Sequence, residues 1–342
     1  MRRYTRCLHA KIANLRDWAN IVLQLRKIPC SPPSVESLAP RRGARMVKIN
    51  SVELLTELNA LKAEYVRNRS IFIPGSTVSR LAEALGAKRM DLQGLRDSCS
   101  NLPNDPTLAF RKSANGRFSL DCDRRRIERL EHQPYILSTA EDFIRHDSGE
   151  LRRFSEIDEN LQKSPALHAL MLLKFFMIDG VSVAPRPMLD YESSKWVCTL
   201  FSLRTVTTPD LMGEPALEGV HSDGVDHTMT VYIGSQNMTA DSATTFLHAP
   251  QQESGTRWDE VDSSLTLESF QHREFLDTVI FIDYERKHSV SSVLPIDHQK
   301  RSTRDMLLFF TRKPAIKGHV AFPYDSFVCH EARPLSVAAD LL

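Results

Sequence analysis

The second half of the chain is a series of short β-rich runs, and this pattern constrains the fold more than any other feature of the sequence. Polar loops rich in turn-forming residues separate the runs, which are Trp196–Val206, Thr228–Ile233, Thr244–His248, Thr278–Ile282, Ser289–Leu294 and Arg304–Thr311. Short strands of this kind, after a helical start, are typical of a double-stranded β-helix with helices that buttress one sheet. The sequence therefore predicts an α+β chain with a jelly-roll, cupin-like core.

Upstream of these runs the pattern is helical. Leucines recur at helical spacing after Ser51, and a second periodic segment begins with Thr77 as a capping residue and stops at Gly86. Ser164-Pro165 opens a later helix, which we expect to pack on the outside of the sheet. Asn115-Gly116 lies between two β-rich runs, where this dipeptide favours a hairpin turn.

Four segments follow from these patterns. Residues 1–45 are predicted to be a flexible N-terminal extension, 46–99 a helical N-terminal region, 100–320 the jelly-roll domain and 321–342 a C-terminal tail. Residues 1–27 are basic and partly amphipathic, which also fits a mitochondrial targeting segment, although Asp17 and the scarcity of serine weaken that alternative. We therefore favour a disordered or loosely helical extension on a cytoplasmic protein.

The composition is that of an ordinary globular protein. Of its 342 residues, 42% are hydrophobic and 25% charged, so a sizeable core is available. The net charge is +1, and the sequence has no basic patch with interleaved aromatic residues, so nucleic acid is not expected as a partner. No apolar run approaches the roughly 18 residues that a bilayer span needs, so no membrane association is expected. The six cysteines show no CxxC spacing, which indicates reduced thiols and disfavours a thiolate metal site. Oligomeric state is not predicted.

His221 and Asp223, with His288 further along, form a candidate metal site. The first two are separated by one residue, so in extended backbone their side chains leave the same face. A third ligand has to come from a distant strand, and His288 follows the apolar strand Thr278–Ile282 after a polar turn. Two imidazoles and one carboxylate on one face of an ion are the facial triad of non-haem Fe(II) oxygenases.

Two neighbouring features leave alternatives open. The loop from Ala249 to Ser264 is long and polar, and it is either a lid over the site or an elaborated surface loop. Four other imidazoles lie near the site in sequence, and each is expected to be structural or exposed rather than a ligand: His227, His248, His272 and His298.

The residues around the metal pair resemble those of a known enzyme family. The order Glu218-Gly219-Val220-His221-Ser222-Asp223-Gly224, then Asp283 and His288, then Arg304-Asp305, resembles the 2-oxoglutarate/Fe(II) dioxygenases that include isoleucine 4-hydroxylase and other free-amino-acid hydroxylases. Four upstream stretches are also similar: Arg117–Leu120, His132–Tyr135, Leu151–Phe154 and Phe201–Arg204. The resemblance spans residues 100–315 and extends to fungal members that oxidise valine-like amino acids in secondary metabolism.

The resemblance implies a cosubstrate site beside the metal. His221, Asp223 and His288 match the iron ligands of the family, and Arg304 matches the arginine that binds the far carboxylate of 2-oxoglutarate. A guanidinium suits this task because its planar fork binds a carboxylate through two parallel hydrogen bonds. Many such oxygenases place a serine two residues after the arginine, where this chain has Met306. A helper hydroxyl is then expected from Thr230 or Tyr232, and Arg301 is the rival of Arg304.

Period-two alternation also suggests residues for the substrate. Arg304, Met306, Leu308 and Phe310 share one strand face, so if Arg304 points inward the apolar members either shape the pocket for an aliphatic substrate or are ordinary core. Arg204 is expected to point inward and to bind a substrate carboxylate. Glu218 is the candidate partner of an ammonium group, although exposed positions are the commoner outcome for such residues.

The chemistry that the resemblance implies is oxidation of an aliphatic C–H bond, with Fe(II) as the metal and 2-oxoglutarate and O2 as cosubstrates. The substrate would be a small free amino acid, and the outcome either hydroxylation or an oxidative cyclisation such as aziridine formation from valine, with release of succinate and CO2. Two alternatives stay open: an oxygenase that modifies a protein or peptide side chain, and a non-catalytic cupin-like binding protein. The intact triad and Arg304 argue against the second.

Overall fold

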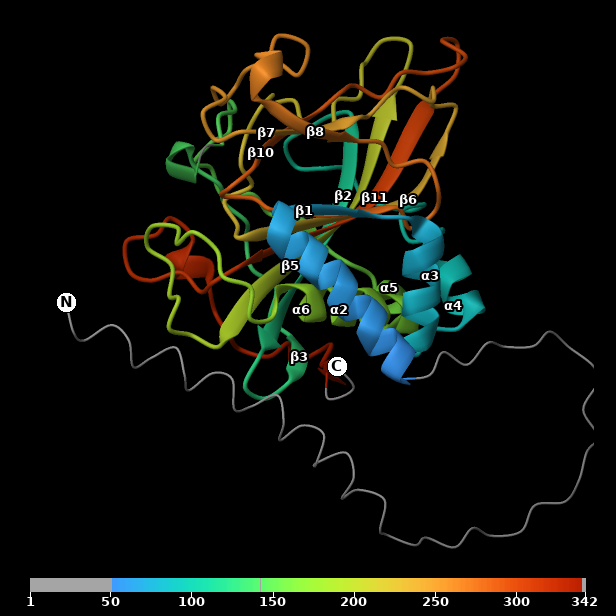
Figure 1. The fold of residues 1–342 in the computed structure, drawn as a ribbon. Coiled ribbons are helices and arrows are strands. Elements are labelled where there is room, and N and C mark those ends of the chain that lie inside the picture. Colours follow the sequence, from blue (N-terminus) through green and yellow to red (C-terminus); the bar gives the residue numbers. More distant parts are fainter. Residues whose placement is uncertain (1–50, 142, 340–342) are drawn as a thin grey trace, which may run out of the picture. The chain divides into compact units, whose positions relative to one another are not determined.

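Two sheets, almost entirely antiparallel, form the centre of the protein (Figure 1). The computed structural model describes residues 51–141 and 143–339, so the predictions for the 1–45 extension lie outside the described residues. Within these ranges the larger sheet has nine strands in the order β1-β9-β6-β11-β5-β2-β3-β12, with the short β4 paired in parallel to β2. A smaller sheet has the order β10-β7-β8. This arrangement is consistent with the expected jelly roll.

The strands and helices have the following bounds. The larger sheet consists of β1 (Ser70–Ile73), β2 (Arg111–Asp121), β3 (Arg126–Arg129), β4 (Ser155–Glu156), β5 (Lys195–Thr207), β6 (His227–Gln236), β9 (Thr278–Ile282), β11 (Ser302–Arg312) and β12 (Ser336–Ala338). The smaller sheet consists of β7 (Thr245–His248), β8 (Thr266–Phe270) and β10 (Lys287–Val290). The helices are α2 (Ser51–Asn68), α3 (Gly75–Ala84), α4 (Arg89–Leu95), α5 (Glu159–Lys163) and α6 (Pro165–Ile178), with short 3-10 turns at Thr139–Glu141, Ser263–Leu265 and Phe322–Tyr324.

The two faces of the central strands lie in different environments. Leu307 and Phe309 of β11, with Leu200 of β5, belong to the main hydrophobic core together with the buried face of the helices. Helix α6 is buried along almost its whole length, as its all-round apolar sequence requires. The helices therefore cover one face of the larger sheet, as Figure 1 shows, and the alternate residues of the same strands face the other side. That second face carries the cavity described below.

The β-rich runs correspond to strands. Five of them coincide with β5, β6, β7, β9 and β11, and the sixth, Ser289–Leu294, overlaps β10, which begins two residues earlier and ends at Val290. The predicted hairpin at Asn115-Gly116 is wrong, because both residues lie inside the continuous strand β2. A β-carbon at Gly116 would lie 2.4 Å from Nη1 of Arg129 and 2.7 Å from Cδ1 of Ile157. Glycine is therefore needed for close packing there and not for a turn.

Both ends of the described chain join the larger sheet. Strand β1, which the helical pattern did not predict, pairs with β9 from Ser70↔Phe281 to Ile73↔Thr278. Residues of α2 and α3 belong to the main core. Strand β12, within the segment expected to be a tail, pairs with β3.

Among residues 51–141 and 143–339, no helix combines the length and the apolar character that a membrane span requires.

Candidate metal centre

The turn before β6 carries the first two predicted ligands. Gly219 and Gly224 bracket His221 and Asp223, and both glycines have positive φ angles, 72° and 69°. A β-carbon at Gly219 would lie 2.3 Å from the carbonyl oxygen of Thr256, so this position needs glycine for space as well as for conformation. The backbone therefore bends sharply on both sides of the pair, and these bends bring the side chains of His221 and Asp223 together.

The third predicted ligand reaches the pair through the backbone. The amide of His221 donates to the carbonyl oxygen of His288 at 3.0 Å, and the amide of His288 donates to the carbonyl oxygen of His221 at 2.9 Å. Directly opposed residues of such a bridge project their side chains to the same side. The two imidazoles accordingly lie 4.2 Å apart between ring centroids, although 66 residues lie between His221 and His288 in the sequence.

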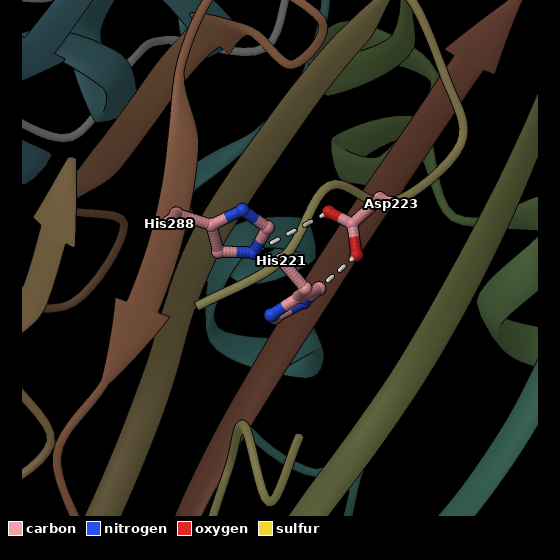
Figure 2. Close-up of side chains that lie close together, drawn as sticks. All are labelled: His221, Asp223 and His288. Carbon is pink, nitrogen blue, oxygen red and sulfur yellow. Dashed lines mark ion pairs between the residues drawn. The ribbon is translucent and has the colours of Figure 1, made fainter. Parts of the chain in front are cut away.

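His221, Asp223 and His288 turn toward one another, as Figure 2 shows. Nε2 of His221 lies 3.4 Å from Oδ1 of Asp223, and Nε2 of His288 lies 3.5 Å from Oδ2 of the same carboxylate. Each residue offers a ligand atom, these atoms all lie within 4.8 Å of one another, and all three residues are buried. In the part of the chain that the structure describes, no other cluster of His, Cys, Asp or Glu meets this criterion.

Neighbouring groups hold these side chains in place. Nδ1 of His221 lies 2.9 Å from the carbonyl oxygen of Gly219, which directs Nε2 to the centre. Asp283 accepts hydrogen bonds from the amide of Asp223 at 3.0 and 2.9 Å, and its carboxylate lies 3.7 Å from Nδ1 of His288. Thr228 donates to Oδ2 of Asp223 at 3.1 Å. Orientation by such partners is characteristic of metal ligands.

The electrostatics of the cluster favour a cation. Burial disfavours a charged imidazole at His221, but the carboxylates of Glu218 and Asp223 outweigh it and raise its pKa to about 9. Burial, together with the charge on His221, lowers the pKa of His288 to about 3. The carboxylates therefore favour a positive charge at the centre. Two nitrogens and one oxygen on one side of an ion are the donor set that Fe(II) takes in non-haem oxygenases. The residues present fit a ferrous ion.

The cluster lines a cavity of about 110 Å³ between the sheets. Its wall is largely apolar and aromatic, with four arginines and two carboxylates: it includes Tyr135, Phe143, Arg145, Arg152, Phe154, Phe201, Leu203, Glu218, Thr230, Arg304, Met306, Leu308 and Phe310. The predicted face of β11 therefore lies on the cavity, and so does Glu218. None of residues 249–264 lines it, but their loop is tied to the metal turn because Gly255 donates to Val220 and Val220 donates to Thr256.

Arg304 is a buried guanidinium that faces this cavity. Its exposed fraction is 5%, its Nε has no hydrogen-bond partner, and no carboxylate pairs with it among the described residues. Burial lowers its pKa to about 10, still far above neutral, so it carries a positive charge. Arg301, the rival, is exposed and is not part of the wall. The geometry thus leaves Arg304 in need of an anionic ligand.

The two expected helper hydroxyls differ in position. Thr230 lines the cavity, and its Oγ1 lies 3.0 Å from Nε2 of His272. Tyr232 does not line it, and its hydroxyl donates to Oγ of Ser235 at 2.7 Å. Of the other imidazoles, His248 is bonded to Ser289 and His227 to Tyr65, whereas His298 is exposed.

The prediction that Arg204 points inward is wrong. Its guanidinium makes two hydrogen bonds of 2.6 Å to Asp305 and one to the backbone of Ser100, and it does not line the cavity. The inward residues of β5 are those of opposite parity, Phe201, Leu203 and Thr205. The run is apolar on both faces, so its alternation did not reveal which face was which. The acidic Asp305, opposite Arg204 in the register, is the signal that would have done so.

Two polar residues of the wall have no role predicted from the sequence. Tyr135 and Arg152 are joined by an isolated antiparallel bridge, with amide–carbonyl distances of 2.9 Å in both directions. Both lie in stretches on which the family resemblance rests, but neither has a motif of its own. Only the bridge, which depends on the tertiary structure, brings them to the same side of the cavity.

A family model, a known enzyme and solved structures are similar to this chain. A family model described as 2OG-Fe dioxygenase matches residues 96–310. The bifunctional enzyme flvA of Aspergillus flavus is 40% identical over 295 residues, which cover 86% of this chain and 36% of that enzyme, so the chain spans about a third of this relative's length. The solved structure of the Fe(II)/α-ketoglutarate-dependent dioxygenase TqaL shares 45% identity and a TM-score of 0.73 over 84% of this chain and 97% of that one.

A more distant structure shows the same fold. The structure titled IDO from Bacillus thuringiensis has a TM-score of 0.58 and 14% identity, over 75% of this chain and 99% of that one. At this identity the likeness concerns the arrangement of the strands and helices alone.

Proposed function

This chain belongs to the 2OG-Fe dioxygenase family, and from that premise we propose that it oxidises an unactivated C–H bond of a small free amino acid. The family consists of oxidoreductases that use Fe(II), 2-oxoglutarate and O2, and these are its cofactor and cosubstrates. The observation that carries the proposal is that the His221–Asp223–His288 cluster lines one cavity with Arg304, which pairs with no carboxylate in the described part of the chain.

Each residue has a task in this reaction. His221 and His288 through Nε2, and Asp223 through its carboxylate, would hold the metal. Bound there, Fe(II) supplies the redox chemistry by which O2 converts 2-oxoglutarate to succinate and CO2 and an aliphatic C–H bond is oxidised. Arg304 binds the far carboxylate of 2-oxoglutarate through its fork, and Thr230, which lines the same cavity, would supply the helper hydroxyl.

The apolar part of the wall is suited to an aliphatic side chain. Met306, Leu308 and Phe310 lie on the same strand face as Arg304 and line the cavity with it. They would exclude water and orient the C–H bond that reacts. The outcome is hydroxylation, or an oxidative cyclisation such as aziridine formation from valine, in secondary metabolism. In line with the free cysteines Cys99, Cys122, Cys198 and Cys329, we propose a cytoplasmic setting.

The size of the cavity favours a small solute over a protein side chain. A polypeptide substrate needs an open groove along which its backbone can lie, whereas this cavity measures about 110 Å³ and is lined by buried and half-buried residues. A non-catalytic binding protein is disfavoured because all three metal-binding side chains and Arg304 are in place.

The test is succinate formation with Fe(II), 2-oxoglutarate and a panel of the standard amino acids, followed by the mass of the product. We expect aliphatic amino acids to stimulate succinate release, with a product that has gained one oxygen or lost two hydrogens. Asp223→Ala, which lacks one ligand, serves as the inactive control. If no free amino acid stimulates turnover but a peptide does, the alternative of a peptide oxygenase replaces this proposal.

A further inference from the structure

The cavity contains more positive charge than the cosubstrate requires. Arg111, Arg145, Arg152 and Arg304 all line it. Arg111 is paired with Asp105 at 2.6 Å, and Arg145 makes hydrogen bonds of 2.5 and 2.8 Å to Asp147. With Arg304 reserved for 2-oxoglutarate, Arg152 remains.

Arg152 is buried and incompletely paired. Its exposed fraction is 5%, and although Nε lies 3.2 Å from Asp147, neither Nε nor Nη2 has a hydrogen-bond partner within residues 51–141 and 143–339. The guanidinium lies 4.8 Å from the centroid of the Phe143 ring, which holds its plane in place. A buried donor without a partner is costly, so this group is suited to an acceptor that arrives with a ligand.

Tyr135 presents a second free donor beside it. The antiparallel bridge between Tyr135 and Arg152 sends both side chains to one side, and both line the cavity. The hydroxyl of Tyr135 is buried and makes no hydrogen bond to any residue that the structure describes. Burial keeps this phenol protonated, because it raises the pKa of Tyr135 far above neutral. A hydroxyl and a guanidinium together match the two oxygens of a carboxylate.

Glu218 supplies the opposite charge. Its Oε2 is buried without a hydrogen-bond partner among the residues described, at 3.8 Å from Nη1 of Arg145, and its Oε1 lies 3.3 Å from Nε2 of His221. Glu218 lines the same cavity as Arg152 and Tyr135, so its buried carboxylate oxygen can accept hydrogen bonds from a cationic group of a ligand there.

We propose that Arg152 and Tyr135 bind the α-carboxylate of a free α-amino acid, and that Glu218 binds its α-ammonium group. The inference deepens the proposed function and rests on it. It assigns to Arg152 the contact that the sequence had suggested for Arg204. A peptide-linked residue carries neither charge, so this wall selects the free zwitterion.

The experiment pairs each altered residue with an altered ligand. Binding is measured by calorimetry on protein loaded with Ni(II) and 2-oxoglutarate, so that no turnover is needed. The ligands are the amino acid that stimulates succinate release most strongly, its carboxamide and its N-acetyl derivative. The variants are Arg152→Lys, Tyr135→Phe and Glu218→Gln. Arg111→Lys is the matched control, because it makes the same change at a cavity arginine that already has its carboxylate partner.

Wild-type protein is expected to bind the free amino acid at least about 30-fold more tightly than either derivative, as the loss of one member of a buried charge pair implies. Arg152→Lys should weaken binding of the free amino acid by a similar factor and leave binding of the carboxamide unchanged. Glu218→Gln should weaken binding of the free amino acid and leave binding of the N-acetyl derivative unchanged. Tyr135→Phe should weaken binding of the free amino acid by a smaller factor than Arg152→Lys does, and Arg111→Lys should leave it unchanged.

Several results would overturn the inference. One is an Arg152→Lys protein that binds the free amino acid as wild type does. Another is a loss of 2-oxoglutarate affinity in that variant, which would assign Arg152 to the cosubstrate. If the panel finds a substrate but its carboxamide and N-acetyl derivatives bind as tightly as the free amino acid, the roles assigned to Arg152, Tyr135 and Glu218 are wrong while the proposed function stands. If no amino acid binds at all, the proposed function fails with it.

Discussion

Single side chains set the charge of the cavity. Arg204 and Arg304 lie on adjacent paired strands, yet they serve opposite faces of the sheet. Arg204 is neutralised by Asp305 through two hydrogen bonds of 2.6 Å on the side away from the cavity, whereas none of the described residues gives Arg304 a carboxylate partner on the cavity side. Because neighbouring positions of a strand alternate, one step along β11 separates a structural carboxylate from the guanidinium available to a ligand.

Arg304→Ala should raise the 2-oxoglutarate concentration needed for half-maximal turnover on the order of 100-fold, since a bidentate charge-assisted contact is worth about 3 kcal/mol. Arg301→Ala removes an exposed arginine three residues away and should leave this concentration unchanged. Steady-state succinate assays at saturating amino acid measure both. Equal effects of the two substitutions would remove the assignment of the cosubstrate to Arg304.

Replacing Leu308 or Phe310 by alanine should change the distribution of products more than the metal content. Both side chains line the cavity but neither lies within the ligand cluster, so their loss widens the space around the reacting C–H bond and leaves the metal donors intact. Mass spectrometry of the products and metal analysis of the purified variants give the two readouts. A variant with normal products and reduced metal would contradict the proposed wall.

At the scale of elements, close approaches to glycine determine how the strands and turns fit together. Gly219 lets the carbonyl oxygen of Thr256 approach the metal turn, and Gly116 lets Arg129 and Ile157 approach the middle of β2. Strand β2 pairs with β5 along its whole length, from Arg111↔Thr205 to Asp121↔Lys195, and β5 carries part of the cavity wall. The close packing at Gly116 therefore supports the site indirectly.

Gly116→Val should lower the free energy of unfolding by about 1–3 kcal/mol, because added side-chain atoms would overlap with Arg129 and Ile157 in a packed interior. Gly94→Ala in α4 is the control: nothing lies within 4 Å of its added β-carbon, so the helix should gain up to about 1 kcal/mol. Denaturant unfolding of both variants tests the contrast. A Gly116→Val protein as stable as wild type would show that β2 relaxes at this point.

At the scale of the whole molecule, the metal centre joins the two sheets. His221 and Asp223 precede β6 of the larger sheet, and His288 lies on β10 of the smaller one. The bridge between His221 and His288 is a backbone link between these parts, and a metal held by the three side chains would add a second link. Binding to the folded state alone stabilises it by mass action.

Loading with Fe(II) or Ni(II) should therefore raise the melting temperature of the wild-type protein, with a stabilisation of about 2.7 kcal/mol at a metal concentration 100 times the dissociation constant. Asp223→Ala should show little or none of this gain. Differential scanning calorimetry with and without metal, under nitrogen, makes the comparison. The ligand assignment would have to be abandoned if Asp223→Ala gained as much as wild type.

Much of this protein could be predicted from the order of its residues. Short β-rich runs between turn-rich loops predicted the strands from Trp196 to Thr311, and His-x-Asp with a distant histidine predicted residues that the fold brings together, because local spacing and side-chain chemistry are properties of the sequence itself. The strand face of Arg304, Met306, Leu308 and Phe310 followed from the alternation of side chains along a strand.

Only the tertiary structure decided the rest. The inward face of β5 depends on its pairing with β11, which opposes Arg204 to Asp305. The strand role of Asn115-Gly116 depends on neighbours that pack against it, and the position of Tyr135 and Arg152 side by side depends on a bridge between separate segments. In each case the outcome rests on contacts between residues far apart in the chain, which no local pattern encodes. The sequence thus determined which chemical groups the protein contains and how they alternate, and the fold decided which of them share the cavity.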